Sequence, residues 1–201
     1  FLWRRKAINV IGRSYKNPEI LDVATGTCDL AIGAMRLKPS GVTGIDLSEK
    51  MLEIGKQKII KKKLEHTIRL MQGCAEELPY SSNTFDVTMV AFGVRNFADP
   101  VKGLSEMYRV LRDGGMIMVL EFSKPVVFPF KQIYYFYFTK ILPLMGRLFS
   151  KSKNAYTYLP ESVMLFPDNE DFLDLLKSVG FKNNIQKKLS GGIASIYTGL
   201  K

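Results

Sequence analysis

The chain alternates between short apolar runs and longer segments with the spacing of amphipathic helices. The apolar runs predict strands near residues 19–24, 41–46, 67–73, 84–93 and 115–122, and the segments between them predict helices near 29–37, 48–63 and 100–111. Strands separated by helices are typical of βαβ crossovers. The pattern therefore predicts an α/β fold with a mostly parallel sheet.

Residues with a preference for helix ends support two of these boundaries. Asp99 followed by Pro100 is typical of an N-cap and a first helical residue, and the run Arg112–Gly115 contains glycines that end a helix. A later helix over 168–179 is expected to be capped by Asp168.

The rest of the chain carries no sign of a second domain. Residues 184–201 have the pattern of a closing strand pair, and no internal repeat or low-complexity linker is present. We therefore expect a single domain over residues 1–201. The chain begins at Phe1 inside an expected helix, so we expect the true N-terminus to be missing.

Polar and small residues follow strand after strand, at the ends that a parallel sheet brings to one edge. They are Thr25, Gly26 and Thr27 after the first strand, Asp46 at the end of the second, Cys74 and Ala75 after the third, Gly93, Arg95 and Asn96 after the fourth, and Glu121 at the end of the fifth. Ligands of open α/β sheets bind beyond the carboxyl ends of the strands. The sequence therefore predicts a ligand site at this edge.

The spacing between Gly26 and Asp46 narrows the class of ligand. Asp46 lies 20 positions after the glycine, where an acidic side chain can accept both hydroxyls of a ribose. The turn at Gly26 lets backbone N–H groups approach a ligand, and the helix N-terminus behind it attracts negative charge. Alternatively, Asp46 caps the helix that begins at Ser48.

The same turn argues against a dinucleotide, because it lacks the G-x-G-x-x-G run whose second glycine admits a pyrophosphate. S-adenosylmethionine carries no phosphate. Its carboxylate and amine can be held by the turn while its ribose lies on Asp46. We therefore expect S-adenosylmethionine as the cofactor.

The composition excludes some classes of binding partner but does not identify one. The 201 residues, 46% of them hydrophobic, carry a net charge of +10, which favours phosphate, nucleic acid or an anionic membrane surface. The stretch "NFADP" is not the [DN]-P-P-[YF] motif of nucleic-acid methyltransferases, so no nucleic acid is expected. Cys28 and Cys74 are too few for a disulfide framework and lack zinc-ligand spacing, which predicts a reducing compartment and no metal.

The segment "FPFKQIYYFYFTKILPLMGRLF" is rich in aromatic residues, but Lys131, Lys140 and Pro143 interrupt it, so it contains no membrane-spanning run. The five consecutive aromatic residues Tyr134–Phe138 would point around a whole helix. We expect some of them to face an apolar substrate, a partner chain or a membrane interface, although a buried helix pair over the sheet is the alternative.

Six stretches together give the chain a family resemblance. It resembles the ubiquinone/menaquinone-biosynthesis C-methyltransferase family in "LDVATGTCDLA", "VTGIDLSEKML", "MQGCAEELPYSSNTFDVTMVAFGVRNFADP", "GLSEMYRVLRDGG", "VLEFSKP" and "YTYLPES". The first two are shared by many class I methyltransferases, whereas "FGVRNFADP", "LEFSKP" and "YTYLPES" are far more specific to this family. The resemblance covers Trp3 to the end, and we expect the family's N-terminal lid segment to be missing.

The resemblance implies a class I S-adenosylmethionine-dependent methyltransferase with a Rossmann-like fold. We expect a mostly parallel seven-stranded sheet, a C-terminal antiparallel hairpin and a helical insertion over 128–166 that covers the substrate. The implied reaction is C-methylation of a polyprenylated quinol, demethylmenaquinol to menaquinol. The alternatives are the ubiquinone-pathway quinol and a non-catalytic quinone or lipid carrier. A cytoplasmic protein, peripheral to the bacterial inner membrane and able to form a homodimer, would suit this substrate.

The resemblance also assigns residues to the cofactor site, and three of its positions depart from the family pattern. The implied residues are Gly26, Thr27, Asp46, Leu47, Cys74, Ala75 and Ala91. Cys28 replaces a usual glycine, Cys74 replaces an Asn or Asp, and Ala91 replaces the serine of some members. Two lost side-chain hydrogen bonds of about 1 kcal/mol each would weaken cofactor binding roughly tenfold to thirtyfold.

Methylation of a ring carbon needs a stabilised phenolate and a proton acceptor. Arg95 is the expected phenolate stabiliser, since a guanidinium stays charged and binds an oxyanion through a planar fork. Asn96 would orient the ring oxygen, and Tyr158 would relay the proton. The alternatives are a salt bridge from Arg95 to Asp99 and a packing role for Tyr158.

Overall fold

A seven-stranded sheet forms the centre of the protein, in a computed structural model that describes residues 2–126, 128, 129, 131, 132, 134 and 162–201. The strands are β1 (Glu19–Val23), β2 (Gly41–Asp46), β3 (Ile68–Gln72), β4 (Phe85–Ala91), β5 (Leu111–Phe122), β6 (Lys182–Leu189) and β7 (Ala194–Leu200). Their order is β3-β2-β1-β4-β5-β7-β6, and β7 runs antiparallel to both its neighbours while the others pair in parallel. The predicted sheet and its closing hairpin are confirmed.

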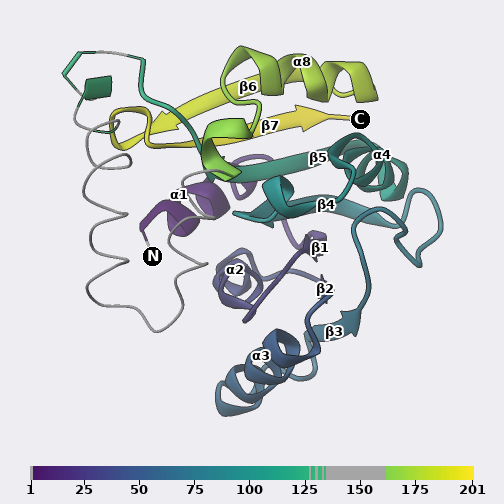
Figure 1. The fold of residues 1–201 in the computed structure, drawn as a ribbon. Coiled ribbons are helices and arrows are strands. Elements are labelled where there is room, and N and C mark those ends of the chain that lie inside the picture. Colours follow the sequence, from purple (N-terminus) through teal and green to yellow (C-terminus); the bar gives the residue numbers. More distant parts are fainter. Residues whose placement is uncertain (1, 127, 130, 133, 135–161) are drawn as a thin grey trace, which may run out of the picture.

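Helices cover both faces of this sheet. They are α1 (Leu2–Ile11), α2 (Asp29–Ala34), α3 (Glu49–Lys61), α4 (Pro100–Val110) and α8 (Glu170–Val179). Figure 1 shows α1 and α2 on one side of the sheet and α4 on the other. Buried residues of α1, α2 and α3 share one core with the sheet, and those of α4 and α8 share the second. Strands that are covered on both faces explain the nearly continuous apolar runs in the sequence.

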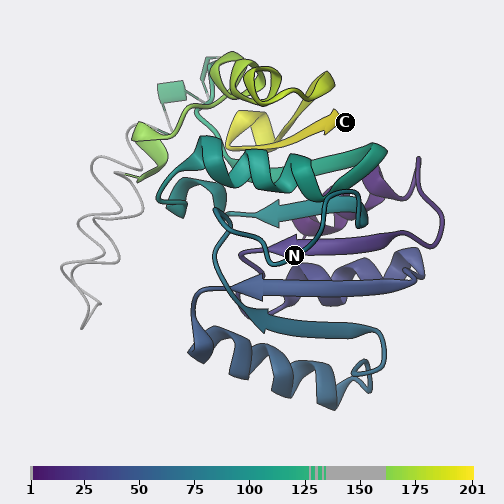
Figure 2. The same ribbon diagram turned by 90° about the vertical axis from the view of Figure 1, so that its right-hand side faces the viewer.

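The carboxyl ends of β1 to β4 meet at one edge, as Figure 2 shows by the arrowheads at its left. The register pairs Val23 at the end of β1 with Ile45, one residue before the end of β2. Residues that follow these strands are therefore neighbours in space. The predicted position of the ligand site rests on this geometry.

One predicted helix cap is confirmed and two are wrong. The run Arg112–Gly115 does not cap α4, because the C-cap residue is Leu111 and the run lies within β5. Asp99 caps α4 by accepting a hydrogen bond from the backbone N–H of Lys102 at 3.0 Å, with Pro100 as the first helical residue. The expected cap of α8 by Asp168 is wrong, because the N-cap residue is Asn169 and makes no side-chain cap. The Asp168 carboxylate instead accepts the backbone N–H of Lys124 at 2.5 Å and pairs with its ammonium at 3.0 Å. The carboxylate therefore binds Lys124 in place of the helix N-terminus, because an ion pair with charge-assisted hydrogen bonds is the stronger interaction.

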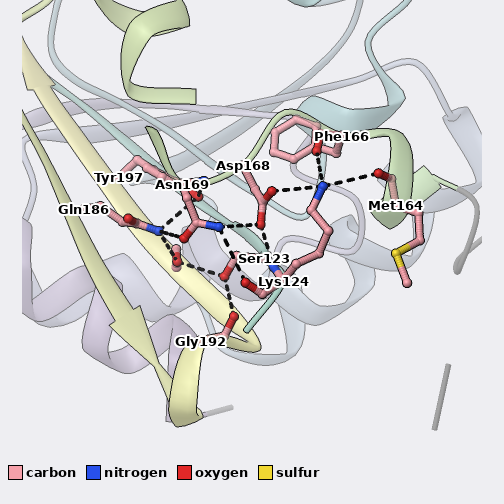
Figure 3. Close-up of polar contacts among 10 residues, drawn as sticks. Ser123, Lys124, Met164, Phe166, Asp168, Asn169, Gln186, Gly192 and Tyr197 are labelled. Carbon is pink, nitrogen blue, oxygen red and sulfur yellow. Dashed lines mark hydrogen bonds and ion pairs between the residues drawn. The ribbon is translucent and has the colours of Figure 1, made fainter. Parts of the chain in front are cut away.

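A polar network extends this contact to the C-terminal hairpin (Figure 3). The Gln186 amide donates to Asn169 at 2.9 Å and to Ser195 at 2.8 Å, and the hydroxyls of Ser195 and Ser123 lie 2.9 Å apart. The backbone N–H of Asn169 donates to the Tyr197 hydroxyl at 2.8 Å. The network joins the end of β5, the start of α8 and both hairpin strands.

The insertion predicted over 128–166 lies mostly outside the described residues. Of its aromatic run, Tyr134 is described and buried. No helix among the described residues has the length and apolar character needed to cross a membrane.

Candidate functional site

Two adjoining cavities lie at the carboxyl edge of the sheet, with volumes of about 350 and 240 Å³. Both are lined by Ala24, Asp46, Gly93 and Asn96. The first cavity is also lined by the predicted site residues Gly26, Thr27 and Ala91, and the second by Leu47 and Ala75. Cys74, half-buried beside Ala75, is not among the described residues that line either cavity. The edge therefore brings together residues from four strand ends.

The turn after β1 has an alternating left-handed backbone. Ala24, Gly26 and Cys28 have φ angles of 53°, 57° and 64°. Glycine adopts this conformation without strain, whereas a residue with a Cβ pays about 1–2 kcal/mol. The turn thus has the backbone of a glycine-rich loop, although two of its three left-handed positions are not glycine.

The third of these residues is accommodated by α3. A Cβ on Gly55 would lie 2.3 Å from the Cys28 sulfur, so the thiol occupies the space that the missing side chain leaves. Burial raises the pKa of the Cys28 thiol to about 11, which keeps it protonated at neutral pH. We interpret Cys28 as a packing residue.

Asp46 links the turn to the start of α3. One carboxylate oxygen accepts the backbone N–H of Gly26 at 2.8 Å, and the other accepts the backbone N–H of Ser48 at 2.8 Å. Ser48, not Asp46, is the N-cap residue of α3. A carboxylate has about four lone-pair sites, so Asp46 keeps capacity to accept further hydrogen bonds.

The backbone N–H groups of two residues of the turn, Gly26 and Cys28, are already committed within the protein. Gly26 donates to Asp46, and Cys28 donates to the Thr25 carbonyl at 2.9 Å. The Thr27 hydroxyl accepts from the Lys58 ammonium at 2.7 Å, and Lys58 also pairs with Asp29 at 2.7 Å. The side chain of Thr27 therefore interacts with α3.

Asp22 is a residue of the first cavity that our sequence analysis missed. It is 1% exposed, and one carboxylate oxygen accepts from the Thr25 hydroxyl at 2.6 Å and from the Ala31 backbone N–H at 3.1 Å. The other oxygen has no hydrogen-bond partner among the described residues. Burial raises the pKa of Asp22 to about 7. An acid in the middle of the apolar strand "EILDV" was the available signal.

Arg95 lies in the 3-10 helix Val94–Asn96 that follows β4, and it forms an ion pair with Glu121 at the end of β5. The pair is buried, and the guanidinium lies 5.3 Å from the ring centre of Phe122. Burial raises the pKa of Glu121, and the charge of Arg95 acts in the opposite direction. The alternative partner Asp99 caps α4 instead. Among the described residues, Asn96 lines both cavities whereas Arg95 lines neither, and Tyr158 lies outside the described residues.

An aromatic cluster brings α1 to the same edge. Trp3 packs against Phe92 and Phe122, each with ring centres 6.2 Å away, and its indole N–H donates to Ser190 at 2.9 Å. Phe92 lines the first cavity and has a left-handed φ of 60°. The sequence did not indicate that α1 reaches the site.

Comparison with known proteins places these features in context. The ubiE/COQ5 methyltransferase family matches residues 1–201. A demethylmenaquinone methyltransferase of Porphyromonas gingivalis is 47% identical over 100% of this chain and 82% of its own length. A ubiquinone/menaquinone biosynthesis C-methyltransferase UbiE of Geotalea daltonii is 46% identical over 99% of this chain and 85% of its own length.

Solved structures agree on the fold. An S-adenosylmethionine-dependent methyltransferase of Aquifex aeolicus has a TM-score of 0.71 at 16% identity, covering 98% of this chain and 88% of that chain. The [4+2]-cyclase SpnF has a TM-score of 0.73 at 16% identity, covering 98% and 80%. Because this fold also carries a cyclase, likeness of fold does not determine the reaction. The predicted class I Rossmann-like fold is confirmed.

Proposed function

Since this chain belongs to the ubiE/COQ5 methyltransferase family, as its motifs predicted, we propose that it methylates a ring carbon of a polyprenylated quinol, with S-adenosylmethionine as the methyl donor. The substrate we propose is demethylmenaquinol, in line with the name of the 47% identical relative. The ubiquinone-pathway quinol is the second candidate, because other relatives are named for both pathways. The observation that carries the proposal is the pair of cavities joined at Asp46.

The residues that line the cavities fit the proposed cofactor. Asp46 lies between the cavities and can accept ribose hydroxyls. Asp22 has a buried carboxylate oxygen that lacks a partner in the described part of the chain, which suits the ammonium of the methionine moiety. Leu47 and Ala75 line the second cavity and offer an apolar contact to adenine. When bound, S-adenosylmethionine supplies an electrophilic methyl group on a sulfonium.

The substrate must become a better nucleophile before a new carbon–carbon bond forms. A hydroquinone loses one phenolic proton, and the resulting phenolate places electron density on the ring carbon that accepts the methyl group. The same carbon then loses its own proton, which restores aromaticity, and the ring oxygen takes up a proton to become a phenol again, so that one proton is released overall. The protein must therefore stabilise an oxyanion and accept a proton.

We assign stabilisation of the phenolate oxyanion to Arg95. Its guanidinium has five N–H donors, so it can bind an oxyanion while Glu121 keeps its orientation. Asn96, which lines both cavities, would orient the ring oxygen. We propose Tyr158 as a proton relay from its sequence motif alone.

We further propose that the protein binds peripherally to the cytoplasmic surface of the bacterial inner membrane, where a polyprenylated quinol is found. A net charge of +10 favours anionic lipid, and the large apolar side chains of Val126, Phe128 and Leu165 are exposed. Sedimentation with vesicles of anionic and of neutral lipid tests this proposal. A homodimer remains a prediction that light scattering can test.

Reduced demethylmenaquinone and isotopically labelled S-adenosylmethionine test the main proposal directly. Mass spectrometry should detect one labelled methyl group on the quinone ring, and Asp46→Ala should yield much less product. Binding of both compounds without methylation would favour the quinone carrier. Failure to bind S-adenosylmethionine would refute the proposed function.

A further inference from the structure

Arg4 is a cation on the inner face of α1. It lies three and four positions before the buried residues Ala7 and Ile8, which places it on the same side of the helix. Arg4 is half-buried and lines the first cavity, whereas its neighbour Arg5 is exposed. The two arginines differ in position although they share the same charge.

Packing fixes the part of α1 that carries this cation. Trp3 contacts the rings of Phe92 and Phe122 and donates its indole N–H to Ser190. The Arg4 guanidinium lies 5.8 Å from the ring centre of Phe92, which lines the same cavity. A cation at this distance is attracted by the face of the ring. The contacts of Trp3 and the ring of Phe92 therefore hold Arg4 beside the cavity.

Acidic residues dominate the charge of the first cavity. Asp22, Asp29 and Asp46 line it, and Arg4 is the single cation among the described lining residues. Asp29 already pairs with Lys58. In this cavity the ammonium of a ligand can pair with the buried acid Asp22, and the carboxylate of the same ligand can pair with the cation Arg4. The methionine moiety of the proposed cofactor carries both groups.

Two of the other donors expected for that carboxylate already have partners within the protein. The backbone N–H groups of Gly26 and Cys28 donate within the protein. A guanidinium binds a carboxylate through two parallel charge-assisted hydrogen bonds, which are stronger than hydrogen bonds from neutral backbone N–H groups.

We propose that Arg4 binds the carboxylate of the methionine moiety, so that α1 forms part of the cofactor site. The proposal rests on the proposed function in that it takes S-adenosylmethionine as the ligand. It assigns recognition of the two charged groups to two different elements. Asp22 on β1 would receive the ammonium, and Arg4 on α1 would receive the carboxylate.

Calorimetry with S-adenosylmethionine and its decarboxylated analogue tests this assignment without measuring turnover. The wild type should bind S-adenosylmethionine more tightly than the analogue. Arg4→Gln should weaken binding of S-adenosylmethionine about tenfold to a hundredfold and leave the analogue unchanged. Arg4→Lys should retain part of the preference, and the exposed control Arg5→Gln should keep all of it. Circular dichroism establishes that each variant is folded.

The outcomes separate this proposal from the broader one. Equal weakening of both ligands by Arg4→Gln, or no weakening at all, would overturn the role of Arg4 while the proposed function stands. Wild-type protein that binds neither ligand would overturn both proposals. Loss of discrimination in Arg4→Gln alone would support the assignment.

Discussion

The buried pair of Arg95 and Glu121 can be tested by replacing both partners with apolar side chains of similar size. Glu121 is 0% exposed and Arg95 is 11% exposed, so removing one partner leaves the charge of the other buried. We expect Arg95→Met and Glu121→Leu each to lower the free energy of unfolding by about 3–5 kcal/mol. The double variant should recover most of this loss, because an apolar pair replaces an ion pair at little net cost.

Turnover distinguishes a catalytic from a structural role of Arg95. If the guanidinium stabilises the phenolate, the double variant is stable but its kcat remains at least about a hundredfold lower, which is about 2.7 kcal/mol. Arg95→Lys, which keeps the charge and loses the planar fork, should also lower kcat about a hundredfold while cofactor binding survives. Urea denaturation measures stability, and methylation of reduced demethylmenaquinone measures kcat. A double variant that is stable and within a few-fold of wild-type kcat would refute the oxyanion assignment.

Three further predictions concern the first cavity and its turn. Asp46→Ala should weaken binding of S-adenosylmethionine by about 1.5–3 kcal/mol, and an unchanged dissociation constant would contradict the ribose assignment. Because the pKa of Asp22 is raised from 3.8 to about 7, the folded state retains a proton that the unfolded state loses, so wild-type unfolding free energy should fall as pH rises across this range. Asp22→Asn should lack this fall, and identical pH profiles from denaturation would count against it. Gly55→Ala should weaken cofactor binding by pushing on the Cys28 thiol, and Cys28→Gly in the same chain should restore it; calorimetry that finds no restoration would contradict the packing role.

Local sequence patterns predicted the sheet and the edge that carries the site. The central strands β1, β4 and β5 are buried over most of their length, so they appear in the sequence as nearly continuous apolar runs. The spacing between Gly26 and Asp46 predicted a ribose site, which stays a prediction, and the structure brings the two residues together through a 2.8 Å hydrogen bond that the sequence did not predict. Neighbouring parallel strands end at the same level, which is why a spacing along the chain became a distance in space.

Contacts between distant segments could not be predicted in the same way. Glu121 was recognised as a strand-end residue, but its pairing with Arg95, 26 positions away, depends on how β4 and β5 lie side by side. Asp168 has the sequence signal of a helix cap and instead binds Lys124, 44 positions away. Arg4 lines the first cavity, and Trp3 packs α1 against residues at the ends of β4 and β5, so these contacts join segments that are far apart in the sequence.

The turn after β1 has the left-handed backbone of a glycine-rich loop although it lacks two of the glycines. Its left-handed backbone at Ala24 and Cys28 costs about 1–2 kcal/mol per residue, which glycine would avoid. Contacts from outside the turn hold it nonetheless, since Asp46 accepts the N–H of Gly26, and the thiol of Cys28 occupies the space that Gly55 leaves. Strain persists only where surrounding structure fixes the backbone. The conformation of this turn is therefore encoded as much in β2 and α3 as in the turn itself, so a glycine count alone underestimates its capacity to bind a cofactor.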